Sequence, residues 1–179
     1  SLDISVNIYL IGFMGSGKSS AGKGIAACLR WSFTDLDKLV EEKVGMTVAG
    51  IFASKGEEFF RKAEAEALQD VSGQPRRVVA CGGGTPCSDK NISLMKATGV
   101  TVYLRVTVDE LVSRLNRSVT ERPLLKDAGP DELHSSVKKL LEKRSSWYEQ
   151  ADLILDPETM GEEEMTTMIA DTVRSKGVC

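Results

Sequence analysis

The sequence predicts an α/β fold in which helices cover both faces of a five-stranded parallel sheet. Three observations lead to this fold class. Five short apolar runs alternate with helical patterns along the chain, which is typical of βαβ units. The longest of these runs are mostly apolar, as strands buried on both faces are. At 179 residues the chain has the length of one domain, so we expect residues 1–179 to form a single unit.

Each predicted element follows from its local pattern. The strands are expected at residues 7–13, 31–36, 77–81, 100–106 and 151–155. A first helix is expected over residues 17–30, because apolar residues recur there at helical spacing. These residues are Ala21, Ile25, Cys28 and Leu29. A similar stripe predicts a helix over residues 131–150. The segment before it, residues 116–130, is rich in charge and contains Gly and Pro, which indicates a lid.

Composition and charge argue against several classes of protein. Apolar residues make up 41% and charged residues 27% of the chain, which is typical of a soluble globular protein and not of a membrane protein. The net charge of -3 gives no basic excess, so nucleic acid is not an expected partner. The four cysteines lack metal-ligand spacing and indicate free thiols in the cytoplasm. Because the chain begins with Ser1, a plastid location stays open if a targeting segment was removed.

Residues 12–19 carry the strongest single motif. They read Gly-Phe-Met-Gly-Ser-Gly-Lys-Ser and fit the pattern G-x-x-x-x-G-K-[ST], between a predicted strand and a predicted helix. In this pattern, successive backbone N–H groups face phosphate oxygens at the positive end of a helix. Lys18 is expected to reach the outer phosphates and the Ser19 hydroxyl to bind Mg²⁺. A glycine-rich turn without a ligand is the alternative, and the complete pattern in this position argues against it.

Two carboxylates follow the second predicted strand. Asp35 and Asp37 are two residues apart, so their side chains share one face if the strand continues, near the crevice where open parallel sheets bind ligands. One carboxylate is suited to hold the water shell of a metal ion, and the other to accept a proton from a substrate hydroxyl. A helix N-cap is the structural alternative. The phosphate motif upstream favours the catalytic interpretation.

A glycine run and two arginines provide further candidates. Gly82, Gly83 and Gly84 follow the third predicted strand, where the lack of side chains lets a ligand approach the backbone; a flexible turn is the alternative. Arg144 falls on the apolar stripe of its predicted helix, where a charge needs a partner. A snorkelling stem, an internal salt bridge or a bound carboxylate would each satisfy it. Arg61 lies at the edge of another apolar stripe and is a weaker case of the same kind.

Two further charged or titratable residues are Arg122 and His134. Arg122 lies inside the predicted lid, where a guanidinium can neutralise charge on a transferring phosphoryl group; a solvated lid charge is the alternative. His134 is the single histidine and has no nucleophile motif beside it. We expect it to be a structural or solvated side chain.

As a set, these motifs resemble those of the shikimate kinases, small P-loop kinases of chorismate and aromatic amino-acid biosynthesis. The resemblance runs from about residue 6 to residue 156. Gluconate kinases and nucleoside monophosphate kinases share the phosphate loop without the complete set. In chain order the set reads Gly-Phe-Met-Gly-Ser-Gly-Lys-Ser (12–19), Asp-Leu-Asp (35–37), Gly-Glu-Glu-Phe-Phe-Arg (56–61), Gly-Gly-Gly (82–84), Arg-Pro-Leu-Leu (122–125), and Lys-Arg (143–144) followed by Tyr148.

The resemblance implies a fold and an activity. The fold is a three-layer P-loop NTPase type with strand order 2-3-1-4-5, a lid at about residues 116–130 and an acceptor-binding segment at about residues 37–71. The activity is the transfer of the γ-phosphoryl group of ATP, with Mg²⁺, to the 3-hydroxyl of shikimate. We expect the enzyme to act as a monomer without a nucleic-acid or membrane partner.

The resemblance also assigns roles to residues. The implied catalytic residues are Lys18, Asp37 and Arg122, with Asp37 as the base. The implied shikimate-binding residues are Asp37, Arg61, Gly82, Gly83, Gly84 and Arg144. The implied nucleotide-binding residues are Gly15, Ser16, Gly17, Lys18, Ser19, Ser20 and Arg122. Ser19 and Asp35 would serve Mg²⁺, Asp35 through water, because no acidic residue ends the third strand.

Two other functions stay open from the sequence. A P-loop kinase for another polyol acid, such as gluconate, would also need arginines for a carboxylate. A catalytically dead relative that binds nucleotide as a regulatory module is the other alternative. Such a protein would usually have lost Lys18, Asp37 or Arg122, and all three are present.

Overall fold

A five-stranded parallel sheet forms the centre of the computed structural model, which describes residues 2–117 and 130–177. Its order is β2-β3-β1-β4-β5, and every neighbouring pair is parallel. The strands are β1 (Asn7–Ile11), β2 (Ser32–Asp35), β3 (Arg77–Ala80), β4 (Gly99–Leu104) and β5 (Leu153–Leu155). The predicted fold class, the five strands and the implied strand order are confirmed.

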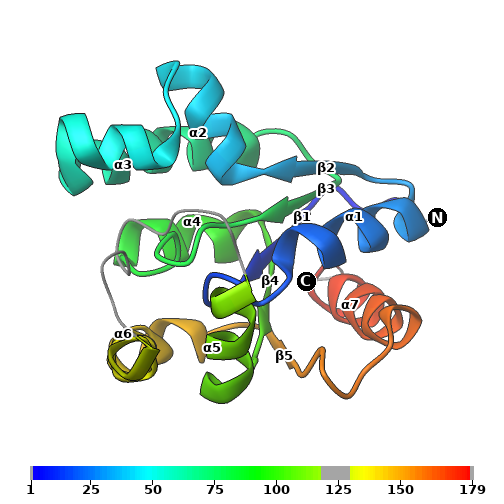
Figure 1. Ribbon diagram of the computed structural model, residues 1–179. Coiled ribbons are helices and arrows are strands. Elements are labelled where there is room, and N and C mark those ends of the chain that lie inside the picture. The colour runs from blue at the N-terminus through cyan, green and yellow to red at the C-terminus, as the bar shows by residue number, and fades with distance from the viewer. Residues whose placement is uncertain (1, 118–129, 178–179) are drawn as a thin grey trace.

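Helices cover both faces of this sheet (Figure 1). They are α1 (Lys18–Leu29), α2 (Leu36–Val44), α3 (Val48–Ser72), α4 (Asp89–Thr98), α5 (Val108–Arg117), α6 (Pro130–Tyr148) and α7 (Glu162–Gly177). The long α3 is kinked at Gly56, whose φ of 85° is not helical. In the described ranges, no helix combines the length and the apolar character needed to cross a membrane.

The central strand β1 shows why the apolar runs are continuous. Ile8 and Leu10 belong to the core beneath α1 and α7, whereas Tyr9 and Ile11 belong to the core beneath α3 and α4. All four side chains are fully buried. Each buried aliphatic side chain stabilises the fold by roughly 1.5–3 kcal/mol, so both faces of the sheet contribute.

The apolar stripe of α1 differs from the prediction. Its buried residues are Gly22, Ile25, Ala26 and Leu29. Cys28, which was expected on this stripe, is exposed. The buried face is rotated around the helix from the expected stripe, toward Gly22 and Ala26, and Cys28 lies outside it. The expectation that Cys28 belongs to the core is therefore wrong.

The second strand ends earlier than the sequence suggested. Asp35 is its last residue and also the N-cap of α2, where its Oδ1 accepts a hydrogen bond from the backbone N–H of Lys38 at 3.2 Å. Asp37 consequently lies in the first turn of α2. The expected shared strand face is wrong, because the cap hydrogen bond begins a helix there.

The other expected segments lie as follows. Helices α2 and α3 occupy residues 37–71, between β2 and β3, and α6 corresponds to the helix expected over residues 131–150. Residues 116 and 117 end α5. The rest of the expected lid, residues 118–129 with Arg122, lies outside the described residues.

Candidate functional site

Three segments meet at one edge of the sheet. The strands β2, β3 and β1 are neighbours and run in the same direction, so their carboxyl ends lie together. The phosphate motif follows β1, Asp37 follows β2, and the glycine run follows β3. Open parallel sheets bind ligands at this edge. The topology therefore brings together the residues that the sequence analysis selected.

The phosphate loop has the backbone shape that its glycines permit. Gly15 and Gly17 have φ values of 82° and 90°, in the left-handed region that favours glycine, and α1 begins at the next residue, Lys18. The Lys18 ammonium donates hydrogen bonds to the carbonyl oxygens of Gly12 (2.6 Å) and Phe13 (2.8 Å). The charge thus lies against the loop that would surround a phosphate.

Arg114 supports this loop and was not anticipated. Its Nη1 donates to the carbonyl oxygen of Gly15 at 3.1 Å, and its Nε donates to Glu110 at 3.0 Å. The i,i+4 spacing of Glu110 and Arg114 indicates an ion pair on α5. Nothing in the local sequence indicates that the guanidinium also reaches a loop 99 residues away in the chain.

The serines of the motif occupy different environments. The Ser19 hydroxyl donates to Asp35 Oδ2 at 2.8 Å. Ser16 is 2% exposed, and its Oγ has no hydrogen-bond partner within residues 2–117 and 130–177. Ser20 is exposed on the first turn of α1. The Ser19 and Asp35 pair supplies adjacent oxygens, which suits a hard cation such as Mg²⁺.

Asp37 has an unusual acidity. Burial raises the pKa of its carboxyl to about 6, and the negative charges of Glu64 and Asp35 act in the same direction. The positive charge of Lys18 opposes them. A carboxylate with a pKa close to neutral accepts a proton more readily than an ordinary aspartate. Asp37 therefore has the acidity expected of a general base.

The three consecutive glycines each abut a charged side chain. A Cβ atom added at any of them would come within 3 Å of a nitrogen or oxygen of that side chain. These Cβ distances are 2.8 Å from Gly82 to Asp37 Oδ1, 2.6 Å from Gly83 to Arg144 Nη1, and 2.5 Å from Gly84 to Arg61 Nη2. The run therefore lets one aspartate and two arginines converge on a single turn of backbone.

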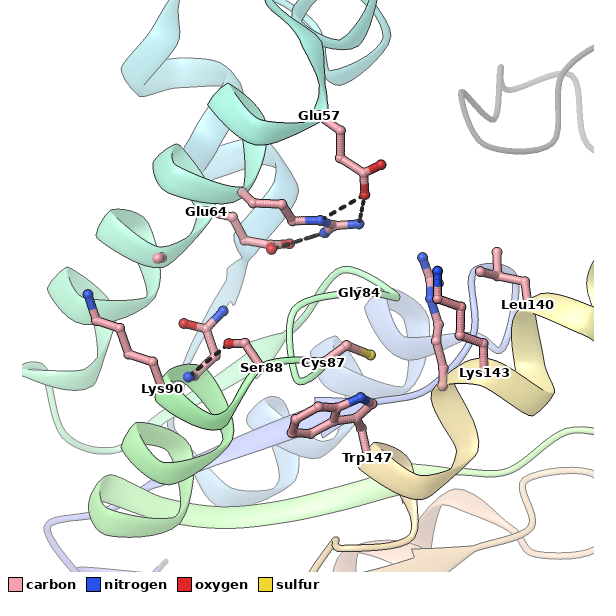
Figure 2. A pocket seen from close by; sticks show the side chains of 13 residues that line it. Glu57, Glu64, Gly84, Cys87, Ser88, Lys90, Leu140, Lys143 and Trp147 are labelled. Atoms are coloured by element: carbon pink, nitrogen blue, oxygen red, sulfur yellow. Dashed lines mark hydrogen bonds and ion pairs between the residues drawn. The ribbon is translucent and has the colours of Figure 1, made fainter.

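Arg61 is held by two glutamates. Its guanidinium donates to Glu57 at 3.2 Å and to Glu64 at 3.0 Å, as the dashed lines in Figure 2 show. Glu64 is 1% exposed and also accepts a hydrogen bond from the Thr85 hydroxyl at 2.8 Å. The sequence analysis missed Glu64. The sequence signal for Glu64 is an acidic residue on the buried stripe of α3, three residues after Arg61, where the two side chains can pair.

Arg144 carries a buried charge. It is 5% exposed, and its Nη1 has no hydrogen-bond partner in the part of the chain that the structure describes. Its guanidinium lies 5.8 Å from the centre of the Phe13 ring. The predicted position on a buried stripe is confirmed, and the described residues contain no salt bridge to it. A buried charge of this kind calls for an anionic ligand.

A cavity of about 540 Å³ opens beside the two arginines, a volume within the usual range for small-molecule sites (Figure 2). Arg61, Arg144 and Gly84 line it, and the indole of Trp147 and the thiol of Cys87 form part of its wall. His134 takes no part in the cavity lining. It is half-exposed and pairs with Asp109 at 3.1 Å, as expected for a solvated histidine.

Comparison with known proteins identifies the family. A family model described as shikimate kinase matches residues 14–174. This chain belongs to the shikimate kinase family. The shikimate kinase of Parabacteroides distasonis is 40% identical over 153 residues, which cover 86% of this chain and 88% of that relative. The shikimate kinase of Thermodesulfovibrio yellowstonii is 40% identical over 163 residues, covering 91% of this chain and 92% of that relative.

A solved structure extends the comparison to three dimensions. Shikimate kinase from Acinetobacter baumannii, in complex with shikimate, superposes with a TM-score of 0.85 at 31% sequence identity. The match covers 96% of this chain and 94% of the other. The likeness therefore includes the whole sheet and the helices that carry the site.

Proposed function

We propose that this chain transfers the γ-phosphoryl group of ATP to the 3-hydroxyl of shikimate, giving shikimate 3-phosphate and ADP. The observation that carries the proposal is Arg144, a buried guanidinium on the wall of a cavity, whose Nη1 has no hydrogen-bond partner among residues 2–117 and 130–177. The single carboxylate of shikimate is a planar anion that matches the guanidinium fork. The Acinetobacter baumannii relative, solved with shikimate, supports this choice of acceptor.

The phosphate loop is the proposed donor site. Its N–H groups and the amino end of α1 would hold the ATP phosphates, and Lys18 would leave the loop carbonyls to contact the outer ones. Arg122 is proposed from the sequence to neutralise charge on the transferring group. The proposed nucleotide-binding residues are Gly15, Ser16, Gly17, Lys18, Ser19, Ser20 and Arg122.

Mg²⁺ is proposed as the metal ion. The Ser19 hydroxyl would bind it directly and Asp35 through water, because their oxygens lie 2.8 Å apart beside the loop. When bound, the ion supplies positive charge that offsets the phosphate oxygens during transfer. The cap hydrogen bond from Lys38 keeps the Asp35 carboxylate oriented toward Ser19.

At the acceptor side, Asp37 is the proposed base. As the 3-hydroxyl oxygen attacks the γ-phosphorus, the Asp37 carboxylate takes the hydroxyl proton, and the bond between the γ-phosphorus and the β,γ-bridging oxygen breaks to release ADP. Arg61, Arg144 and the glycine turn hold the ring so that this hydroxyl faces both the carboxylate and the phosphate loop. Because all these groups lie at one edge of the sheet, the proposed donor and acceptor sites adjoin each other.

The relatives favour shikimate over gluconate as the acceptor, since the matching curated proteins are named shikimate kinases. The presence of Lys18 and Asp37 at the site argues against a dead relative. A cytoplasmic location and a monomeric state stay predictions from the sequence.

Arg144→Lys tests the carboxylate contact. The variant keeps the charge and loses the planar fork, so the affinity for shikimate should fall at least ~10-fold, or ~1.4 kcal/mol. The affinity for ATP without shikimate should barely change. Calorimetric titration with each substrate measures both, and Arg174→Lys, at an exposed arginine on α7, is the matched control. An Arg144→Lys variant that melts early yet binds shikimate normally would show that Arg144 is only structural.

Gly83→Ala tests the convergence on the glycine turn. The added Cβ would lie 2.6 Å from Arg144 Nη1 and push the guanidinium aside. We expect kcat/KM for shikimate to fall roughly 10- to 100-fold, since a displacement of about 1 Å can cost on the order of 10²-fold. Steady-state kinetics measure the loss. Gly161→Ala is the control, because a Cβ there meets no atom within 4 Å, and an equal loss in both variants would contradict the argument.

A further inference from the structure

We propose that Tyr148 is a positioning residue for the acceptor: its hydroxyl fixes the Gly83 carbonyl and thereby holds the glycine turn against Arg144. This inference rests on the proposed function and adds a residue that does not itself touch the substrate. Tyr148 is fully buried, at the last position of α6. Its role would be to set where the turn lies when shikimate binds.

The first support is the hydrogen bond itself. The Tyr148 hydroxyl donates to the carbonyl oxygen of Gly83 at 2.5 Å, a short bond between residues 65 positions apart in the chain. Burial raises the pKa of Tyr148, so the hydroxyl keeps its proton across the physiological range and acts as the donor. The bond therefore ties the middle of the glycine turn to the end of a helix.

The second support is the geometry of α6. Arg144 and Tyr148 are four residues apart and lie on the same face of the helix. Both reach Gly83, because a Cβ at Gly83 would lie 2.6 Å from Arg144 Nη1 while the Gly83 carbonyl accepts from Tyr148. The helix thus contacts the turn at two points one helical turn apart. The turn cannot move away from the guanidinium without breaking the hydrogen bond.

The third support is the packing beneath the ring. The Tyr148 ring lies against the ring of Tyr103, with centroids 5.0 Å apart. Tyr103 is in β4 and pairs with Ile11, the last residue of β1 before the phosphate loop. Tyr148 is therefore fixed relative to the end of the sheet from which the donor loop begins. It passes that position on to the acceptor side through its hydroxyl, which contacts both the Gly83 carbonyl and the Arg144 guanidinium.

Tyr148→Phe is the direct test, and Tyr103→Phe is its matched control. Both variants keep the ring pair, but the Tyr103 hydroxyl has no hydrogen-bond partner in the described ranges, 2–117 and 130–177. Tyr148→Phe should raise the KM for shikimate by about 3- to 10-fold, the range for losing one hydrogen bond that orders a site. Its kcat and its KM for ATP should stay within about 2-fold of the wild type, because the donor loop is untouched. Tyr103→Phe should change none of these values.

Several outcomes would overturn the inference. It fails if Tyr148→Phe binds shikimate as the wild type does, or if it raises the KM for ATP as much as that for shikimate. An equal effect of Tyr103→Phe would show that ring packing alone matters. The proposed function is judged separately on the wild-type enzyme, since an enzyme that does not phosphorylate shikimate refutes it whatever the variants do.

A second measurement does not depend on the variant folding well. The chain has three tyrosines, so enzyme labelled with 3-fluorotyrosine should give three fluorine resonances. The Tyr148 resonance is the one that is absent from the labelled Tyr148→Phe variant. It can also be identified by elimination, once the resonances of Tyr9 and Tyr103 are assigned. Adding shikimate should shift this resonance, and adding ADP alone should leave it nearly in place. The inference would be contradicted if the Tyr148 resonance did not shift when shikimate is added.

Discussion

Replacing Lys18 by alanine should lower kcat by at least ~10²-fold, the scale for losing one preorganised charge at the transferring phosphate. The structure gives the physical reason. The Lys18 ammonium lies on the carbonyls of Gly12 and Phe13, inside the loop that would surround the outer phosphates. Alanine removes this charge and favours helix formation at the first residue of α1, so the fold should persist.

Coupled measurement of ADP release gives the rate, and thermal unfolding verifies the fold. Lys23→Ala is a suitable control, because Lys23 is exposed on the same helix and its ammonium lies 5.9 Å from the Phe33 ring, away from the loop. Lys23→Ala should keep the wild-type rate. A folded Lys18→Ala variant that turns over normally would refute the assignment of the phosphate loop.

Asp37→Asn should lower kcat by roughly 10²–10⁴-fold, the contribution of a positioned general base. Asparagine keeps the shape and the hydrogen bonding to a hydroxyl, but it cannot accept the proton. Asp171→Asn, at an exposed aspartate of α7, is the control and should be active. A loss confined to the KM for shikimate would mean that Asp37 orients the acceptor without acting as the base.

The raised pKa of Asp37 gives the same residue a pH signature. The base must be ionised, so kcat/KM in the wild type should fall as the pH drops through about 6. Whereas activity should fall as the pH drops, the contribution of Asp37 to the stability of the fold should fall as the pH rises. An acid whose pKa is raised on folding stabilises the folded state at pH values below the pKa of the unfolded state, which is 3.8. That contribution to stability is lost as the pH rises through about 6, the pKa of the folded state.

Asp37→Asn should therefore melt at a higher temperature than the wild type above pH 6, with the difference shrinking toward pH 4. Thermal unfolding at several pH values measures this directly. A variant that is less stable than the wild type at pH 8 would show that the Asp37 carboxylate is not destabilised by burial and by the charges of Glu64 and Asp35.

The central strands of the sheet were predictable from the sequence because burial on both faces gives β1 and β4 continuous, largely apolar runs. Tyr9 and Leu10 face opposite cores, and both are fully buried. The error at Asp35 has a local cause. A side chain that accepts the Lys38 N–H begins a helix where apolar periodicity alone would continue a strand.

The parts of the site that were missed depend on contacts between distant segments. Glu64 belongs to the candidate site because it accepts hydrogen bonds from both Arg61 and Thr85, which come from different segments. Arg114 supports Gly15 across 99 residues of chain. Periodicity in one helix shows that a charge is buried, as it did for Arg144, but not which segment provides its partner.

The most direct test of the central claim is the acceptor specificity of the wild-type enzyme. ADP release is measured with ATP and Mg²⁺ and with either shikimate or gluconate, and phosphorus NMR identifies the product. We expect saturable ADP release with shikimate and one new phosphate monoester on its 3-hydroxyl. With gluconate, kcat/KM should be lower by on the order of 10²-fold or more, because the convergent polar groups would be left unmatched. Equal or faster phosphorylation of gluconate, or a rate of ADP release that does not depend on shikimate, would contradict the proposed function.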